Sequence, residues 1–198
     1  MKETPILMKP EMIRAILAGQ KTQTRRLIKF KKPREDCVWC YGKGFEYIDC
    51  QNEHSGYDYR RPCRCCWPKC PYGRKGDLLW VREAFWNSRG DDSMPTYYRA
   101  DQDTLLPIDH NYWSGPWRPS IHMPKWACRL RLELTADPIP QRLQDIMEED
   151  AAAEGVEPAS CCFAYYHGFA KYWDSINGPG TWEKNPWVWK LKFKRVTK

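Results

Sequence analysis

The segment from Gly19 to Arg26 brings an amine, two hydroxyls and two guanidinium groups together within eight residues. Lys21 precedes Thr24 by three residues, and a lysine without its extra proton can take the proton of a nearby hydroxyl, which makes that oxygen a nucleophile. An ordinary lysine has a pKa near ~10.4, so burial or neighbouring cations must lower it by roughly 2–3 for a base near neutral pH. The segment predicts Lys21 as a base and Thr24 as a nucleophile.

The two arginines that follow, Arg25 and Arg26, are candidate substrate-binding residues. A guanidinium group presents a fixed fork of donors to an anion or a carbonyl, and its charge also disfavours a proton on Lys21. The alternative interpretation is a cationic strand without chemistry. In a flat strand Lys21 and Thr24 face opposite sides, so their convergence needs a turn or bulge near Thr22–Gln23.

The residues before this segment predict the elements that position it. Residues 6–8 form a short apolar run typical of a strand. Residues 10–18 repeat apolar side chains with the period of a helix, and Pro10 suits its first position. Gly19 is the expected stop. The Lys21 segment therefore leaves the end of a helix, where the chain can turn.

A second helix supplies the third candidate residue. Asp145 and Glu148 have the spacing of a capping box, which predicts a helix that starts there and ends at Gly155. Glu154 lies in its last turn, where the negative end of the helix dipole disfavours a charged carboxylate. This position suits a general acid, and an ordinary solvated glutamate is the alternative.

The remaining periodicity predicts the fold class. Residues 126–134 and 187–194 alternate with period 2, residues 78–85 and 97–100 are further strands, and residues 163–176 predict another amphipathic helix. Five or six mostly antiparallel strands with three helices predict an α+β fold, a small partly open β-barrel with flanking helices. The length of 198 residues favours one domain over residues 1–198.

Residues 29–74 interrupt that periodicity with proline, glycine, charged residues and cysteines, which predicts an insertion within the domain. Two C-x-x-C turns about 20 residues apart are typical of a zinc knuckle. We predict a structural Zn²⁺ ion held by four thiolates, those of Cys37, Cys40, Cys63 and Cys66. Cys65 or Cys70 in place of Cys66 stays open. Four thiolates leave no position for a catalytic water.

The composition indicates the class of partner. A formal net charge of +7 with 11 Trp and 11 Tyr suits a partner that is both anionic and flat, such as a nucleotide or nucleic acid. The mean hydropathy of −0.77, and the lack of an apolar run near ~18 residues or a secretory signal, predict a soluble, cytoplasmic protein without a membrane partner. Clustered cysteines in that compartment favour metal binding over disulfides.

The positions of Gly19, Lys21 and Arg26 resemble the G-x-K-x-x-E-x-R signature of the ASCH domain, a relative of the PUA RNA-binding fold. Thr24 stands where that signature often has Glu. The similarity extends through residues 75–83, 148–156 and 187–196, and looks like the phage and prophage branch of the family. It implies a PUA-like ASCH β-barrel that carries the zinc insertion.

The form G-x-K-T-x-T-x-R is similar to that of small bacterial ASCH enzymes that hydrolyse N4-acetylcytidine to cytidine and acetate. In those enzymes the Lys is the base, the second Thr the nucleophile and a Glu in a short helix the proton donor. The resemblance implies these roles for Lys21, Thr24 and Glu154. Other members bind or cleave RNA, so a non-catalytic nucleic-acid-binding module and a ribonuclease using Lys21 and Arg26 remain as alternatives.

Overall fold

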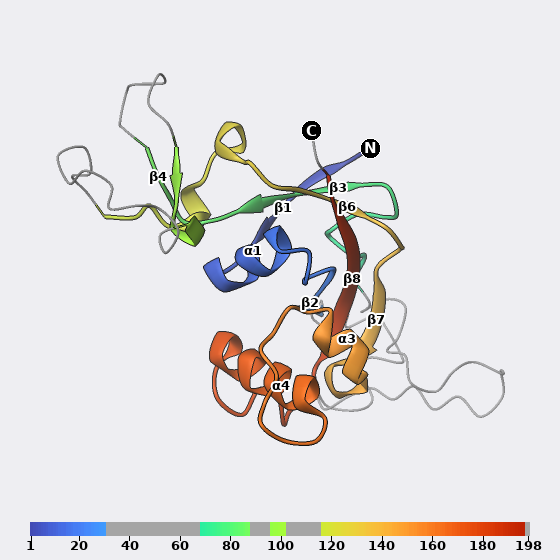
Figure 1. Cartoon of the computed structure of the whole chain (residues 1–198). Helices are drawn as coiled ribbons and strands as arrows, with labels where there is room; N and C mark the ends of the chain where they lie inside the picture. Colours follow the sequence, from blue (N-terminus) through green and yellow to red (C-terminus); the bar gives the residue numbers. More distant parts are fainter. Residues whose placement is uncertain (31–67, 88–95, 102–115, 197–198) are drawn as a thin grey trace, which may run out of the picture. The chain divides into compact units, whose positions relative to one another are not determined.

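The computed structural model describes residues 1–30, 68–87, 96–101 and 116–196. They form a mixed α+β structure, with a main sheet of several strands, a small two-stranded sheet and few helices, which confirms the predicted class (Figure 1). The chain divides into two compact units, residues 1–26 with 71–198 and residues 27–70. Lys21, Thr24 and Glu154, the predicted catalytic residues, lie in the first unit. The predicted zinc ligands Cys37, Cys40, Cys63 and Cys66 lie outside the described residues.

The main sheet follows the path β1-β3-β6-β8-β2, and β7 also pairs with β8. Strands β1 and β3 run parallel, whereas β3–β6, β6–β8 and β7–β8 are antiparallel. The path does not close into a barrel within the part of the chain that the structure describes. The strands are β1 (Glu3–Leu7), β2 (Gln23–Leu27), β3 (Leu78–Arg82), β6 (Arg131–Leu134), β7 (Ile139–Arg142) and β8 (Trp187–Val196).

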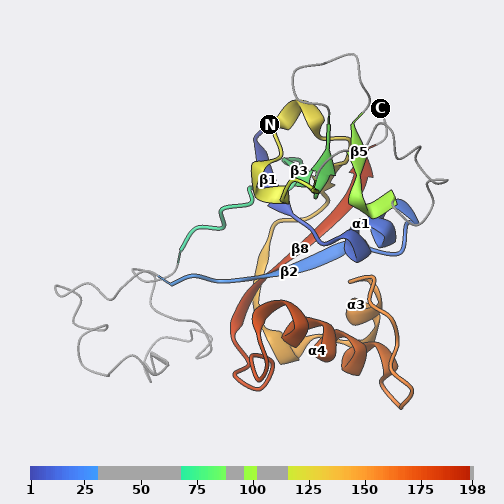
Figure 2. The ribbon, with the colours of Figure 1, turned by 90° about the vertical axis from the view of Figure 1, so that its left-hand side faces the viewer.

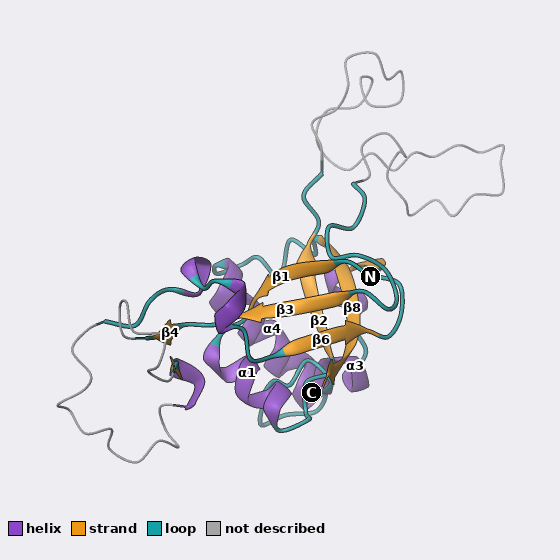
Figure 3. Ribbon diagram, turned by 90° about the horizontal axis from the view of Figure 1, so that it is seen from above, coloured by secondary structure: helices purple, strands orange, loops and turns teal. Residues whose placement is uncertain are grey.

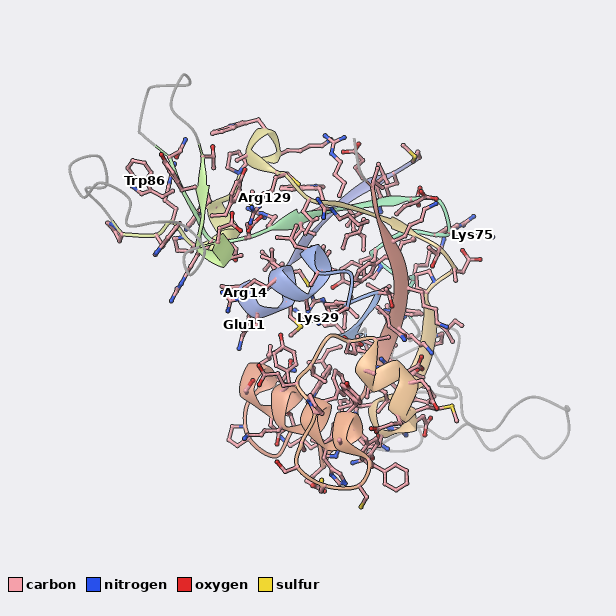
Figure 4. All side chains as sticks on the ribbon, in the orientation of Figure 1. Glu11, Arg14, Lys29, Lys75, Trp86 and Arg129 are labelled. Carbon is pink, nitrogen blue, oxygen red and sulfur yellow. The ribbon has the colours of Figure 1, made fainter. Side chains whose placement is uncertain are left out.

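The predicted strand over residues 126–134 is wrong in its first half. Residues 125–127 form the 3-10 helix η3 (Lys125–Ala127), which follows Pro124. It ends with a hydrogen bond from the backbone N–H of Cys128 to the carbonyl of Lys125. Arg129 then reaches Glu83, with two contacts of 2.9 Å, beside the small sheet of β4 (Phe85–Trp86) and β5 (Tyr97–Tyr98) (Figure 4). The ladder therefore begins only at β6.

The first helix, α1 (Pro10–Leu17), begins and ends as the sequence predicts. Proline occupies its first turn, where the missing N–H needs no partner, and Gly19 follows it with a φ of +76°. Its buried side chains include Met12, Ile13 and Ile16. Figure 3 shows α1 on the same side of β3 and β6 as α4 (Ala164–Asn177).

The helix predicted to start at Asp145 starts later. Residues 143–145 form the 3-10 helix η4 (Leu143–Asp145), and α3 (Glu148–Ala152) begins after Met147. The Glu148 carboxylate accepts hydrogen bonds from the backbone N–H groups of Tyr165 and Tyr166, at 2.8 and 2.9 Å. The first N–H groups of a helix lack partners within it, and Glu148 supplies acceptors for two of these groups in α4. Glu148 therefore caps α4 and not its own helix.

Helices α3 and α4 lie next to each other, beside β8 and β2 (Figure 2). Among the described residues, no helix has the length and apolar character needed to cross a membrane.

Candidate active site

The chain turns between α1 and β2 and docks onto the end of α3. Gly19 takes up the left-handed conformation, and the backbone N–H of Lys21 donates to the carbonyl of Ala15, at 3.1 Å. The next N–H, of Thr22, donates to the carbonyl of Ala153, at 2.9 Å. This carbonyl follows α3 and has no partner within a helix of that length. The first residues of β2 are thus held against the helix that precedes Glu154.

Lys21 and Glu154 form a buried ion pair. The Lys21 Nζ atom lies 2.8 Å from Glu154 Oε2 and 2.7 Å from the Glu154 carbonyl oxygen. The two side chains are 1% and 3% exposed, so little solvent screens the contact. Two of the three predicted catalytic residues, 133 positions apart in the chain, are therefore in direct contact.

Gly155 allows this approach. It has a φ of +70°, and a Cβ atom added there would lie 2.8 Å from the Cβ of Lys21 and 2.8 Å from that of Ala15. Real Cβ atoms do not come that close without displacing a neighbour. The glycine that the sequence predicts only as a helix stop is thus also required where Lys21 crosses the end of α3.

The environment of Lys21 lowers its pKa. Burial is the largest cause, because the charged ammonium loses its hydration. The Glu154 carboxylate opposes this effect, and the charges of Arg26 and Arg25 reinforce it. The resulting direction is the one that a lysine base requires.

Arg25 contacts carboxylates at both terminal nitrogens. Its Nη1 donates to Glu154 Oε1 at 2.8 Å, and its Nη2 donates to Asp150 Oδ2 at 3.2 Å. The guanidinium group also lies 5.8 Å from the centre of the Phe169 ring on α4. Because the side chain is fully enclosed, a substrate could reach it only by displacing these partners. The geometry therefore gives Arg25 the role of holding Glu154.

Asp150 joins this cluster from the outer side. Its carboxylate accepts hydrogen bonds from Gln23 Nε2, at 2.8 Å, from Arg25 and from Lys190 of β8. Burial alone would raise the pKa of Asp150, but the bonds from Lys190 and Gln23 lower it. Sequence reasoning missed all three of Gln23, Asp150 and Lys190. The four-residue spacing of Asp150 and Glu154 was the available signal, since it places both on one side of a helical turn.

Thr24 and Arg26 project from β2 away from this cluster. Neighbouring residues in a strand point to opposite faces, and Gln23 and Arg25 face α3. Thr24 is 4% exposed, and within the described part of the chain its hydroxyl makes no hydrogen bond to the Lys21 amine. Arg26 is half-buried and donates to the carbonyl of Leu7, at 2.6 Å.

Tyr172 on α4 is a further titratable group near the ion pair. Burial raises the pKa of its hydroxyl, the charge of Arg26 lowers it, and those of Glu11 and Glu154 raise it further. Glu11 extends from α1 (Figure 4). Tyr172 on α4 therefore lies within reach of the Glu154 charge, and Glu11 on α1 acts on Tyr172.

The described residues include no group of three or more His, Cys, Asp or Glu side chains arranged to hold a metal ion. Cys65, one alternative zinc ligand, lies with the four predicted ligands outside these residues. Cys70, the other, is partly exposed in the second unit.

Comparisons with protein-family models, with curated proteins and with solved structures found no match. The function is therefore inferred from the geometry of the Lys21 and Glu154 site and from the sequence motif that contains Lys21.

Proposed function

We propose that this protein is an ASCH-type amidohydrolase that removes an acyl group from the exocyclic amine of a cytidine-like nucleoside. The observation that carries the proposal is the buried contact of 2.8 Å between the Lys21 amine and the Glu154 carboxylate. The G-x-K-T-x-T-x-R motif that contains Lys21 and Thr24 supports it. We also propose that this sheet, which is open within the described residues, belongs to a PUA-like barrel fold.

The chemistry needs a neutral amine and a protonated carboxyl group at the same time. Transfer of one proton from the Lys21 ammonium to the Glu154 carboxylate produces both, and the contact of 2.8 Å gives the proton a direct path, while the Glu154 charge itself favours the ammonium form. Burial supports it as well, because an enclosed ion pair loses hydration that a neutral pair does not need.

In the reaction, the Thr24 oxygen forms a bond to the acyl carbon, and Lys21 takes the hydroxyl proton. The bond between that carbon and the nucleoside nitrogen breaks as Glu154 donates its proton to the departing amine. Water then hydrolyses the acyl-threonine ester, which releases the carboxylic acid and restores the hydroxyl. The described structure encloses Thr24 and Glu154, and Thr24 lies on the face of β2 opposite Glu154, so the segment must open to admit a substrate and Lys21 must turn from Glu154 toward Thr24 for the first step. Arg26 is the candidate for orienting the substrate.

Incubation with N4-acetylcytidine tests the proposal. We expect the purified protein to release cytidine and acetate in equal amounts, measured by liquid chromatography. Thr24→Val removes the hydroxyl at similar volume and should abolish release, while Thr24→Ser should retain part of it. Circular dichroism of each variant checks the fold. Absence of turnover by the wild-type protein across a panel of N4-acylated cytidines would overturn the amidohydrolase proposal.

A non-catalytic nucleic-acid-binding module is the second candidate. The observations that favour it are the net charge of +7 and the 64% exposed side chain of Trp126, which offers a stacking surface next to Lys125. Binding of single-stranded RNA without turnover of any acylated nucleoside would favour this module, and its affinity should fall steeply with salt. Shortening of the RNA in the same samples would instead indicate the ribonuclease.

A further inference from the structure

Five charged side chains form a continuous chain of alternating sign through the site. Lys190 contacts Asp150, Asp150 contacts Arg25, Arg25 contacts Glu154, and Glu154 contacts Lys21. The contributing segments are β8, α3 with the turn after it, and the β2 segment. The sequence separates these groups by up to 169 positions between Lys21 and Lys190 (190 − 21), so only the fold joins them.

The chain has an enclosed end and an accessible end. The side chains of Lys21, Arg25 and Glu154 are 1%, 0% and 3% exposed. Those of Asp150 and Lys190 are 19% and 15% exposed. The outer pair therefore can be altered with less disturbance to packing than the inner three.

The position of Arg25 depends on Asp150. The Arg25 Nε atom and the Gln23 Oε1 atom are buried without a hydrogen-bond partner among the described residues. The guanidinium group is thus held by its two carboxylates and by the face of Phe169. Loss of the Asp150 carboxylate would leave Glu154 as the one anion that contacts it in the described structure.

The five groups also carry unequal charge. Three cations face two carboxylates, which leaves one positive charge in excess inside a poorly solvated region. Lys21 is the enclosed lysine of the five groups, and burial disfavours its charged form. Lys21 is therefore the group that responds to changes elsewhere in the chain.

We propose that Asp150 and Lys190 are positioning residues which, through Arg25, hold the Glu154 carboxylate against Lys21 and set which of the two carries the proton between them. The catalytic consequence rests on the amidohydrolase function, but the charge coupling itself does not. Asp150 on α3 and Lys190 on β8 thereby influence whether the Lys21 amine carries a proton. Neither residue belongs to the sequence motif or to the three predicted catalytic residues.

The two outer residues should act on Lys21 in opposite directions. Asp150→Asn removes a negative charge and leaves Arg25 to pair with Glu154 alone, so the Lys21 ammonium loses support and its pKa falls. Lys190→Gln removes a positive charge and frees Asp150 to pair with Arg25, so the ammonium gains support and its pKa rises. We expect each change to move the titration midpoint by roughly one pH unit.

The other charged groups that act on Lys21 stay the same in both variants, and they are Arg26 on β2 and the inner partners Arg25 and Glu154. Tyr172 on α4, which the charges of Arg26, Glu11 and Glu154 influence, also stays unchanged. A general loosening of the fold would expose Lys21 to water in both variants and raise its pKa in both. Opposite shifts therefore separate charge coupling from a structural effect.

The experiment is a pH titration of the full-length protein labelled with ¹⁵N-lysine, in which the Nζ resonances are followed by NMR. Lys21→Met identifies the Lys21 signal. The expected result is a lower midpoint in Asp150→Asn and a higher one in Lys190→Gln, with Lys190→Arg restoring the wild-type value. Lys194→Met is the matched control, because Lys194 lies on β8 but contacts Glu133 instead of the cluster.

Unchanged midpoints, or shifts of the same sign in both variants, would overturn the proposal. If Asp150→Asn does not fold, Lys190→Gln against Lys190→Arg still decides the sign. The pH profile of N4-acetylcytidine turnover is measured in parallel, and its fall at high pH, where the pair loses the shared proton, should move with the midpoint. Opposite NMR shifts without any turnover would retain the charge coupling and remove the amidohydrolase function. Turnover without the opposite NMR shifts would retain the amidohydrolase function and remove the charge coupling.

Discussion

At the scale of single residues, the chemistry of the site depends on whether the buried Lys21 amine carries a proton. Lys21 is enclosed, close to two arginines and paired with one carboxylate, so burial and like charges lower its pKa while Glu154 raises it. A surface lysine with the same neighbours in sequence would keep its proton at neutral pH. The packing of Lys21 against the end of α3 thus affects the chemistry of its amine more than the motif does.

Glu154→Gln tests this balance. The amide cannot donate the proton to the leaving group, so we expect kcat for N4-acetylcytidine to fall by roughly 10²- to 10⁴-fold. In the wild type the active pair holds one proton, on Glu154, so turnover should fall at high pH once that proton is lost. In Glu154→Gln the proton donor is absent, and the residual activity should instead rise with pH as Lys21 loses its proton, at a pKa that removal of the carboxylate lowers further. A variant whose pH–rate profile keeps the wild-type fall at high pH would contradict this assignment.

At the scale of elements, a short helix organises the site. The end of α3 provides the carbonyl that accepts from Thr22, and the left-handed turn that follows it at Gly155 brings Glu154 and Lys21 together. The start of α3 supplies Glu148, which caps α4. A helix of five residues has too little internal hydrogen bonding to be stable alone, so these contacts hold it in place.

Gly155→Ala should damage both stability and activity. Alanine at a φ of +70° is strained, and its Cβ would overlap Lys21, so we expect a loss of about 2 kcal/mol or more in the free energy of unfolding. Chemical denaturation measures this loss. Gly180→Ala is the matched control, because Gly180 has a φ of +72° but no atom within 4 Å of its added Cβ. Equal losses in the two variants would argue against the contact with Lys21.

Glu148→Ala should destabilise α4 without changing the site chemistry. Two backbone N–H groups lose their acceptor, which costs about 1 kcal/mol in the free energy of unfolding. Thermal melting compared with Glu149→Ala, an exposed neighbour on the same short helix, isolates the capping effect. If the two variants melt at the same temperature, Glu148 does not cap α4 in solution.

At the scale of the whole molecule, the chain combines the described α+β unit with a cysteine-rich segment that the sequence predicts to bind zinc. The described residues contain the proposed catalytic groups, whereas the predicted zinc ligands fall between residues 37 and 66. A four-thiolate zinc ion contributes to folding of its own segment and not to the reaction.

Zinc content tests that separation. We expect one zinc ion per chain by elemental analysis, and loss of it in a Cys37→Ser, Cys63→Ser double variant. Because the proposed catalytic groups lie in the other unit, the double variant should keep the Lys21 titration midpoint of the wild type. Wild-type protein without zinc would contradict the predicted finger, and a displaced midpoint would contradict its independence from the site.

Local patterns in the sequence were sufficient for the α+β class, for α1 with its proline start and glycine end, and for β8. Each of these features depends on residues close together in the chain, where side-chain period and backbone geometry act directly. Lys21 and Glu154 were proposed as catalytic residues from the resemblance of the motif and not from local pattern alone, and the structure adds that the two side chains are in contact. The beginning of β6 and the start of α3 were predicted wrongly, because Arg129 and Glu148 form their bonds with residues far along the chain.

Tertiary structure alone decided the partners of Lys21. The enclosure of Arg25, the approach at Gly155 and the junction of Asp150 with Lys190 join three segments that are distant in sequence. Whether a lysine keeps its proton depends on the water and the charges around it, and both are set by which segments pack together. For that reason the motif could suggest Lys21 as a candidate base, but only the folded chain shows what surrounds its amine.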